Sequence, residues 1–412
     1  MFRSLLAAIS TSPLMLLAAA GFAAAQAPNE SRISGPVTHE NLAVYFVHGT
    51  SVAGKVPLTL EEAMAKRLVQ VRETGNVNQL EIENLGNEEV FIQSGDIVKG
   101  GQQDRTLMVS LVLPPKSGRV PIASFCVEQG RWSARGREDV KNFSTSSAAV
   151  PSREMKLAMK APQPAPVVTR GRASGFTTAA AETGERQRQV WDGVAKAQQR
   201  LSSNLGGQVR SGESASSLQL ALENEKLLDA QAAYVNALKA AGEAEPDIIG
   251  YVFAVNGKLN SADVYPSRGL FRKMWGKLLT ASAIEAIGHK DEPRDQAPSV
   301  EAVTAFLADA ERGAASQKPL NAGVRLDTRE GDKAYYFETA APATGCTGII
   351  WRSKASKRRP TISSPRKTGR ARCSTVASSS CRSASQSARC DRCRLLQSRS
   401  FRRSVRRARY PD

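Results

Sequence analysis

The densest group of residues that could do chemistry lies in two short runs, SGDIVKGGQQDR at 94–105 and CVEQGRW at 126–132. The first run contains three glycines, which permit tight turns and close approach of backbone to a ligand. Both runs set charged and amide groups beside strand-like apolar residues. The candidate ligand-binding residues are their polar side chains: Asp96, Lys99, Gln102, Arg105, Glu128 and Arg131.

Two interpretations of these side chains stay open. A guanidinium can hold a carboxylate or phosphate through two parallel hydrogen bonds, so Arg105 and Arg131 could grip a small anionic ligand with help from Gln102. The same arginines could instead pair with Glu128 or Asp96 and simply fix a turn and the register of a strand. The glycine spacing matches neither a phosphate-binding G-x-x-x-x-G-K-[ST] loop nor a dinucleotide-binding G-x-G-x-x-G turn.

Cys126 and the three histidines of the chain give no clear catalytic or metal site. A reactive thiol needs a neighbouring base or cation, and the sequence places none of His39, His48 and His289 near Cys126. On an alternating strand, Cys126 is expected to pack inward as a small hydrophobe. An oxidising compartment would also allow a disulfide between Cys126 and Cys346. Scattered histidines predict no metal site, and nothing predicts a cofactor.

The two runs resemble segments of a bacterial and archaeal family, the ARG and Rhodanese-Phosphatase-superfamily-associated protein domain. Three further segments share this resemblance: NQLEIEN at 78–84, GYVFAVNG at 250–257 and LFRKMWGKLL at 270–279. The resemblance covers roughly residues 38–340. Because the family is known mainly as a domain of unknown activity, the resemblance implies a domain and no particular reaction.

The chain before residue 140 has the pattern of a β-rich part, predicted to span 38–140. Thr59 and Glu62 form a T-x-x-E capping box, which indicates a short helix. Alternating apolar residues from Leu107 to Leu113 indicate one strand with a buried face. The other expected strands are short: 42–47, 68–73, 79–84, 89–93 and 120–127.

Composition changes after this part, and we expect a flexible linker or loop at 141–180, where Ser, Ala, Pro and Gly dominate. Helical periodicity over 190–201 and 227–238 predicts a helical segment at 181–245. The dipeptide Asn256-Gly257 predicts a hairpin inside a strand, hairpin and helix part at 246–345. The fold class is therefore α+β, with one family domain at 38–345.

Residues 1–27 have the three parts of a secretory signal peptide. Arg3 precedes an apolar stretch, and small residues allow cleavage after Ala25 or Ala27. Pro13 interrupts the apolar stretch, and the uninterrupted part is too short to span a bilayer. We therefore expect a periplasmic or secreted protein with no membrane span after cleavage.

The strong positive charge of the chain is confined to its end. Residues 351–412 hold nineteen Lys or Arg and two Asp, a net of +17 out of the +18 of the whole chain. The rest is nearly neutral, so no nucleic-acid partner is expected for it.

We predict that 346–412 is a disordered basic tail, and we hypothesise that it is the product of a frameshift. A frame starting at the third base of the Gly345 codon permits Leu-His-Arg-His-His-Leu-Ala-Lys, which resembles a His- and Arg-rich closing segment expected in the family. A genuine basic tail is the alternative. The pair Cys390-x-x-Cys393 lies in this tail and lacks the second ligand pair of a zinc site.

These observations favour an exported, non-enzymatic binding or interaction module, whose partner would be a small anionic ligand or another protein. The alternative is a periplasmic hydrolase-like or transferase-like enzyme that uses the polar residues of 95–105 and 126–132.

Overall fold

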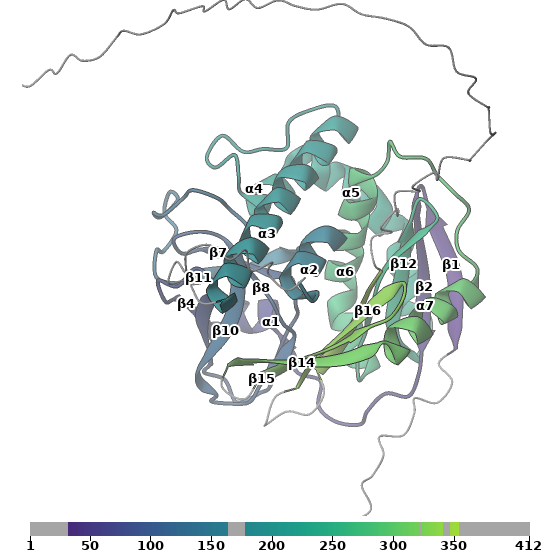
Figure 1. The fold of residues 1–412 in the computed structure, drawn as a ribbon, viewed down its shortest axis with the longest axis horizontal. Coiled ribbons are helices and arrows are strands. Elements are labelled where there is room, and N and C mark those ends of the chain that lie inside the picture. Colours follow the sequence, from purple (N-terminus) through teal and green to yellow (C-terminus); the bar gives the residue numbers. More distant parts are fainter. Residues whose placement is uncertain (1–31, 164–177, 322–323, 341–346, 354–412) are drawn as a thin grey trace, which may run out of the picture. The chain divides into compact units, whose positions relative to one another are not determined.

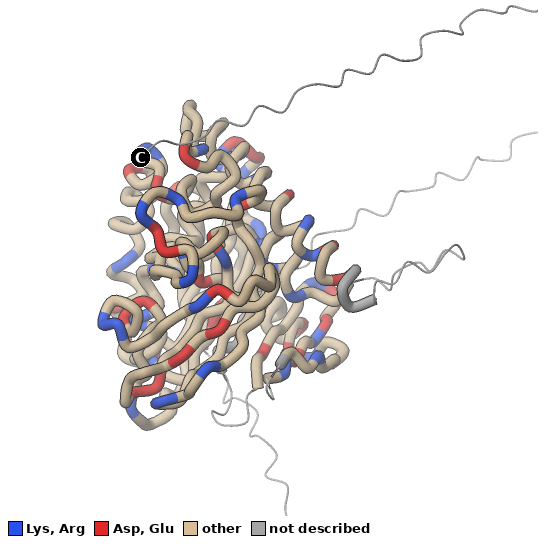
Figure 2. The backbone as a smooth tube through the Cα atoms, turned by 90° about the vertical axis from the view of Figure 1, so that its left-hand side faces the viewer, with Lys and Arg blue, Asp and Glu red and all other residues tan. Residues whose placement is uncertain are grey.

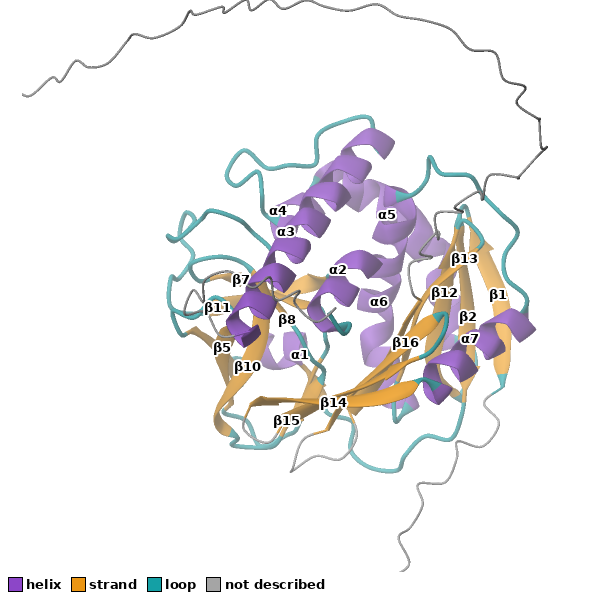
Figure 3. Cartoon of the chain, viewed as in Figure 1, coloured by secondary structure: helices purple, strands orange, loops and turns teal. Residues whose placement is uncertain are grey.

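The protein is an α+β structure in which three β-sheets and a set of helices share one compact unit (Figures 1 and 3). The structure, a computed structural model, describes residues 32–163, 178–321, 324–340 and 347–353. The predicted signal peptide at 1–27 and the chain after residue 353 lie outside these ranges. No helix within them has the length and apolar character needed to cross a membrane.

The largest sheet has eight antiparallel strands. In spatial order they are β1 (Ile33–His39), β2 (Leu42–His48), β12 (Ile248–Val255), β13 (Lys258–Val264), β17 (Thr347–Ser353), β16 (Ala334–Ala340), β15 (Val324–Glu330) and β14 (Ala314–Asn321). Every residue of β2 is buried. Helices lie on both faces of the sheet, and this explains the uninterrupted apolar run that marked β2 in the sequence.

The second sheet has six antiparallel strands that curl into a ring. Their order is β11 (Phe143–Ala149), β7 (Asp96–Gly100), β8 (Arg105–Leu107), β10 (Gly118–Cys126), β5 (Gln79–Asn84) and β4 (Val69–Glu73). An isolated bridge between Arg72 and Asn142 joins the two ends, so the ring is closed at one point. A small third sheet contains β3 (Leu58–Thr59), β6 (Val90–Ile92) and β9 (Leu111–Leu113).

Helix α6 is the central element of the helical layer. It packs on β2 and β12 of the large sheet, on β11 of the ring, and on two neighbouring helices. From Leu278 to Gly288 only Thr280 is not buried, as expected for a helix with protein on nearly every side. The helices are α1 (Leu60–Ala65), α2 (Arg153–Lys160), α3 (Thr178–Asn204), α4 (Leu218–Leu222), α5 (Glu225–Leu238), the 3-10 turn η1 (Lys239–Glu243), α6 (Arg268–Gly288) and α7 (Val300–Arg312).

Several local predictions are confirmed. Thr59 and Glu62 make both hydrogen bonds of the capping box at the start of α1. Asn256 and Gly257 adopt φ of 51° and 75° and connect β12 to β13. A further N-cap, not among these predictions, starts α6, where Ser267 accepts a hydrogen bond from the Leu270 N–H.

Three predictions about elements are wrong. Residues 107–113 form two strands in different sheets, because the chain leaves the ring after Leu107 and joins the small sheet at Leu111. The predicted linker at 141–180 contains β11 and α2: pairing with β7 stabilises a Ser- and Ala-rich strand that propensity alone disfavours. Residues 347–353 form β17, so the fold continues past residue 345; residues 164–177 lie outside the described ranges.

Acidic and basic residues are interleaved along the backbone, as the alternating colours of Figure 2 show. This agrees with the near-neutral charge of the chain before its basic end.

Candidate ligand-binding groove

A groove of about 490 Å³ lies where β11, α5 and α6 meet, and we call it the central groove. Its volume falls in the range of small-molecule sites. Its apolar lining includes Leu222, Val235 and Met274. Its polar lining consists of hydroxyl, amide and charged side chains: Thr145, Ser146, Gln231, Lys239, Lys273 and Lys277, with Glu61 and Glu223.

An ion pair between Asp96 and Lys277 lies beside the groove lining. Lys277 Nζ is 3.2 Å from Asp96 Oδ1 and 3.3 Å from Glu61 Oε2, and it donates to the Ser146 carbonyl at 3.2 Å. Asp96 is 2% exposed, and its other oxygen accepts a hydrogen bond from the Gln93 N–H. This pair joins two segments that carry the family resemblance, 94–105 and 270–279.

The charge on Lys277 is maintained despite its burial. Burial acts to lower the pKa of this ammonium, but the nearby carboxylates of Asp96 and Glu61 outweigh that effect. The pKa of Lys277 is therefore raised above its ordinary value, and the groove keeps a fixed positive group at neutral pH.

Other lysines around the groove have acidic partners, with one exception. Lys273 donates to Glu62 at 2.9 Å, and Lys99 contacts Glu223 at 2.8 Å. Lys239 has no acidic partner among the residues that the structure describes. These four lysines and the four carboxylates of Glu61, Glu62, Asp96 and Glu223 sum to zero, so Lys239 is the lysine whose charge no described carboxylate engages.

One amide in the groove also lacks a partner. The Oε1 atom of Gln231 is shielded from solvent and accepts no hydrogen bond from the described part of the chain. A buried acceptor without a donor is unfavourable by about 1–3 kcal/mol, so this position suits a ligand hydroxyl or amine.

Three of the six predicted ligand-binding residues lie elsewhere, inside or at the end of the β-ring. Glu128 Oε2 accepts from Arg131 Nε at 2.8 Å, and Arg131 also donates to the carbonyls of Gly100 and Gly101. Arg105 is fully buried and pairs with Glu73 at 3.3 Å. The Arg131–Glu128 pair is one that the structural alternative considered, whereas Arg105 pairs with Glu73 and not with Glu128 or Asp96.

Asp104 and Arg135, which the sequence did not single out, form the centre of this network. Arg135 donates to the two oxygens of Asp104 at 3.0 and 3.2 Å. The same carboxylate accepts from the Gly100 N–H at 3.0 Å and from the Ser217 hydroxyl at 2.8 Å. Because protein donors engage both oxygens of this carboxylate, we interpret the Asp104 network as structural.

Burial and ion pairing act oppositely on Arg135. Burial lowers the pKa of its guanidinium, whereas hydrogen bonds to Asp104 and Glu138 raise it by more, so the net shift is upward. The Arg135 guanidinium therefore keeps its positive charge at neutral pH despite its burial.

The six predicted residues thus divide between two places. Asp96 contacts the groove lining through Lys277, and Lys99 does so through Glu223. Arg105, Glu128 and Arg131 belong to the ring. Gln102 contributes its backbone N–H to Glu73 at 3.4 Å.

Cys126 is buried in β10. Its N–H and carbonyl both bond to the side chain of Gln187, each at 2.9 Å. Burial raises the pKa of the Cys126 thiol to about 11, so the group is protonated at neutral pH and is a poor nucleophile. The disulfide considered with Cys346 involves a residue outside the described ranges.

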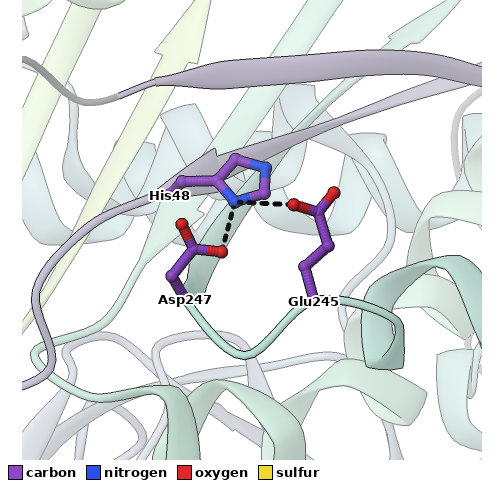
Figure 4. A group of neighbouring side chains, drawn as sticks. All are labelled: His48, Glu245 and Asp247. Atoms are coloured by element: carbon purple, nitrogen blue, oxygen red, sulfur yellow. Dashed lines mark hydrogen bonds and ion pairs between the residues drawn. The ribbon is translucent and has the colours of Figure 1, made fainter.

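The structure also gathers polar residues that the sequence analysis did not connect. His48 lies beside Asp247 and Glu245 at the end of β2 (Figure 4), with Arg32 and Ser34 in contact. A similar group contains Glu154, Glu285 and His289, where Arg200 reaches His289 Nε2 at 2.7 Å. Neither group has a sequence signature, because one member of each, His48 or Glu154, lies far along the chain from the other two.

The fold and the groove together define an α+β domain that carries an open groove with polar and apolar lining between a β-ring and a central helix. The chain belongs to the ARG and Rhodanese-Phosphatase-superfamily-associated Protein domain family, whose model matches residues 30–342. Comparison with curated proteins and with solved structures gave no match.

Proposed function

We propose that this protein is an exported binding module whose central groove takes a small polar molecule with an anionic group. The observation that carries the proposal is the ammonium of Lys277, buried beside a groove that is large enough for such a molecule. Export rests on the signal-peptide pattern of residues 1–27.

The exposed lysine Lys239 supports an anionic ligand. Asp96 and Glu61 hold Lys277, Glu62 holds Lys273, and Glu223 holds Lys99; within the described part of the chain, Lys239 is the lysine without an acidic partner. A ligand carboxylate or phosphate near Lys239 and Lys277 would gain charge-assisted hydrogen bonds. Glu61 is 41% exposed at its side chain, so it can swing away from Lys277.

The neutral groups support a ligand that also carries a donor. The Gln231 Oε1 atom needs a hydrogen-bond donor, and the hydroxyls of Thr145 and Ser146 line the same groove. A hydroxylated or amino-substituted acid of modest size satisfies both requirements.

The test is a thermal-shift screen of the full chain with inorganic phosphate, citrate, glutamate and glycerol 3-phosphate. Any anion that binds only the folded state raises Tm in proportion to the logarithm of its concentration over Kd. We expect at least one of these anions to raise the Tm of the wild type and of Lys258→Met, which removes an exposed lysine outside the groove.

The same anion is expected to leave the Tm of Lys239→Met and of Lys277→Met unchanged. Lys277→Met also removes a buried ion pair, so Lys239→Met serves as the variant that keeps the core intact. An equal shift in the wild type and both groove variants would mean that the anion binds elsewhere, and no shift with any probe would contradict the proposal.

A further inference from the structure

Three side chains form a hydrogen-bonded chain around His48: Ser34 in β1, His48 at the end of β2, and Asp247 just before β12. Ser34 Oγ is 2.7 Å from His48 Nε2, and His48 Nδ1 is 2.7 Å from Asp247 Oδ1. Figure 4 shows the imidazole turned toward Asp247. His48 is 2% exposed, whereas the side chain of Asp247 is 47% exposed.

The strand register explains why these residues meet. Ser34 pairs with Phe46 across β1 and β2, and residues two apart on a strand share a face, so His48 lies on the face of Ser34. Ile248 pairs with His48 in β12, and this sets the preceding residue, Asp247, beside the imidazole. Ser34 lies on β1, an edge strand of the sheet, next to a bulge.

The two ring nitrogens of His48 face the partners that nucleophilic catalysis requires, with Nε2 toward Ser34 and Nδ1 toward Asp247. A carboxylate at Nδ1 favours the tautomer with its proton on that nitrogen, which leaves Nε2 to accept the proton of a serine hydroxyl. We propose that Ser34, His48 and Asp247 form a nucleophile, base and carboxylate that hydrolyse a small ester.

The charges that face the imidazole are mixed but negative in sum. Arg32 Nη2 lies 2.8 Å from His48 Nδ1, 2.7 Å from Glu245 Oε2 and 3.4 Å from Asp247 Oδ2. Two carboxylates and one guanidinium leave one net negative charge, which stabilises the imidazolium formed when Ser34 gives up its proton. The hydrogen bond from His48 is the largest cause of the lowered pKa of Asp247, so this carboxylate is ionised at neutral pH.

Arg32 also offers the competing arrangement. If Arg32 donates to Nδ1, the imidazole proton sits on Nε2 and is donated to Ser34, and the group is then only structural. Nδ1 can take part in just one of these arrangements, and the reactivity of Ser34 distinguishes them.

The reaction proceeds in two balanced steps. Ser34 Oγ bonds to the carbonyl carbon while its proton passes to His48 Nε2; the ester C–O bond then breaks, and the departing alcohol takes that proton. Water next attacks the acyl-serine, gives one proton to His48, and releases the acid as Ser34 regains the proton.

This activity goes beyond the proposed binding function and does not depend on the central groove. None of Ser34, His48 and Asp247 lines that groove. Loss of anion binding therefore leaves this inference intact, and loss of Ser34 reactivity leaves the binding proposal intact.

The test is labelling of the full chain with a fluorophosphonate, which phosphonylates an activated serine with loss of fluoride. Peptide mapping by mass spectrometry is expected to find the label on Ser34 in the wild type and in Ser316→Ala, a matched change on an exposed strand residue. Ser34→Ala is expected to lose the label at that peptide.

Asp247→Asn tests the tautomer of His48. The asparagine amide can donate to Nδ1, which places the imidazole proton on Nε2, where it cannot accept the proton of Ser34. We expect its labelling rate at Ser34 to fall at least about tenfold, since the same change in a serine protease has a far larger effect. An unlabelled Ser34 in the folded wild type, or an unchanged rate in Asp247→Asn, would overturn the proposal.

Discussion

The Asp104 network and the central groove use the same kinds of residue in different settings. In the network, Asp104 and Glu128 are fully buried, and arginines and backbone N–H groups occupy their oxygens. In the groove, Lys277 is buried but Glu61, one of its two partners, is 41% exposed, and Lys239 has no acidic partner among the described residues.

This difference shows how to distinguish an ion pair that stabilises the fold from a charged group that can still bind a ligand. Charged residues beside glycines suggested a site at 95–105 and 126–132, yet a saturated carboxylate has no capacity left for a ligand. The groove has unused capacity at Lys239 and Gln231. Substitutions in the Asp104 network should therefore change stability strongly, whereas a substitution at Lys239 in the groove should change ligand binding.

The largest expected effect is that of Asp104→Ala. The change leaves Arg135 buried without its main partner, and breaking a buried pair in this way costs about 3–5 kcal/mol. Urea denaturation should show this loss of unfolding free energy. Asp192→Ala, a matched change at an exposed position of α3, should stay within about 0.5 kcal/mol of the wild type. A loss below 1 kcal/mol for Asp104→Ala would mean that the network does not stabilise the ring.

Gly101→Ala should destabilise the ring by a smaller amount. Gly101 has φ of +55°, and a Cβ there would overlap the ring of Phe143. Overpacking of this kind costs about 1–3 kcal/mol. Gly75→Ala is the control, because Gly75 also has positive φ but opens to free space. Equal losses in both variants would show that backbone conformation alone, without the contact to Phe143, sets the cost.

A structural feature can be predicted from the sequence alone when the interactions that set it join residues close together in the chain. The capping box at Thr59 and the hairpin at Asn256 are set by neighbours within a few residues, and both were predictable. The strand β11 depends on pairing with β7, which its own Ser- and Ala-rich sequence does not reveal.

The candidate site was only partly predictable for the same reason. Asp96 was named because of its neighbours, but its partner Lys277 is 181 residues away. Asp247 is 199 residues from His48. Only the folded topology brings such residues together.

Lys277→Met should lower stability by about 1–3 kcal/mol, since it leaves the buried carboxylate of Asp96 without its charged partner. The loss is smaller than that of Asp104→Ala because Asp96 keeps its hydrogen bond from the Gln93 N–H. The folded-state pKa of Lys277 is raised above its ordinary 10.5, so the ion pair contributes fully below pH 10.5. That contribution is lost as pH rises through the folded pKa. The difference in unfolding free energy between wild type and variant, measured by urea denaturation from pH 8 upward, should narrow only above pH 10.5. A gap that closed already near pH 8 would contradict the direction of this pKa shift.

The smallest expected effect is that of Lys99→Ala. Lys99 and Glu223 form a partly exposed pair, with 26% and 43% of their side chains accessible. Such pairs contribute about 0–1 kcal/mol. Thermal unfolding should therefore change little, and added salt should reduce even that difference. A loss comparable to that of Asp104→Ala would remove the distinction between the two regions.

The most direct test of the account is calorimetric titration of the anion that gives the largest thermal shift. We predict that Lys239→Met, in the groove, weakens binding at least tenfold, or about 1.4 kcal/mol, and that Arg131→Lys, in the Asp104 network, leaves the affinity within about twofold. Lost affinity in Arg131→Lys together with unchanged affinity in Lys239→Met would contradict the account and return the site to the β-ring.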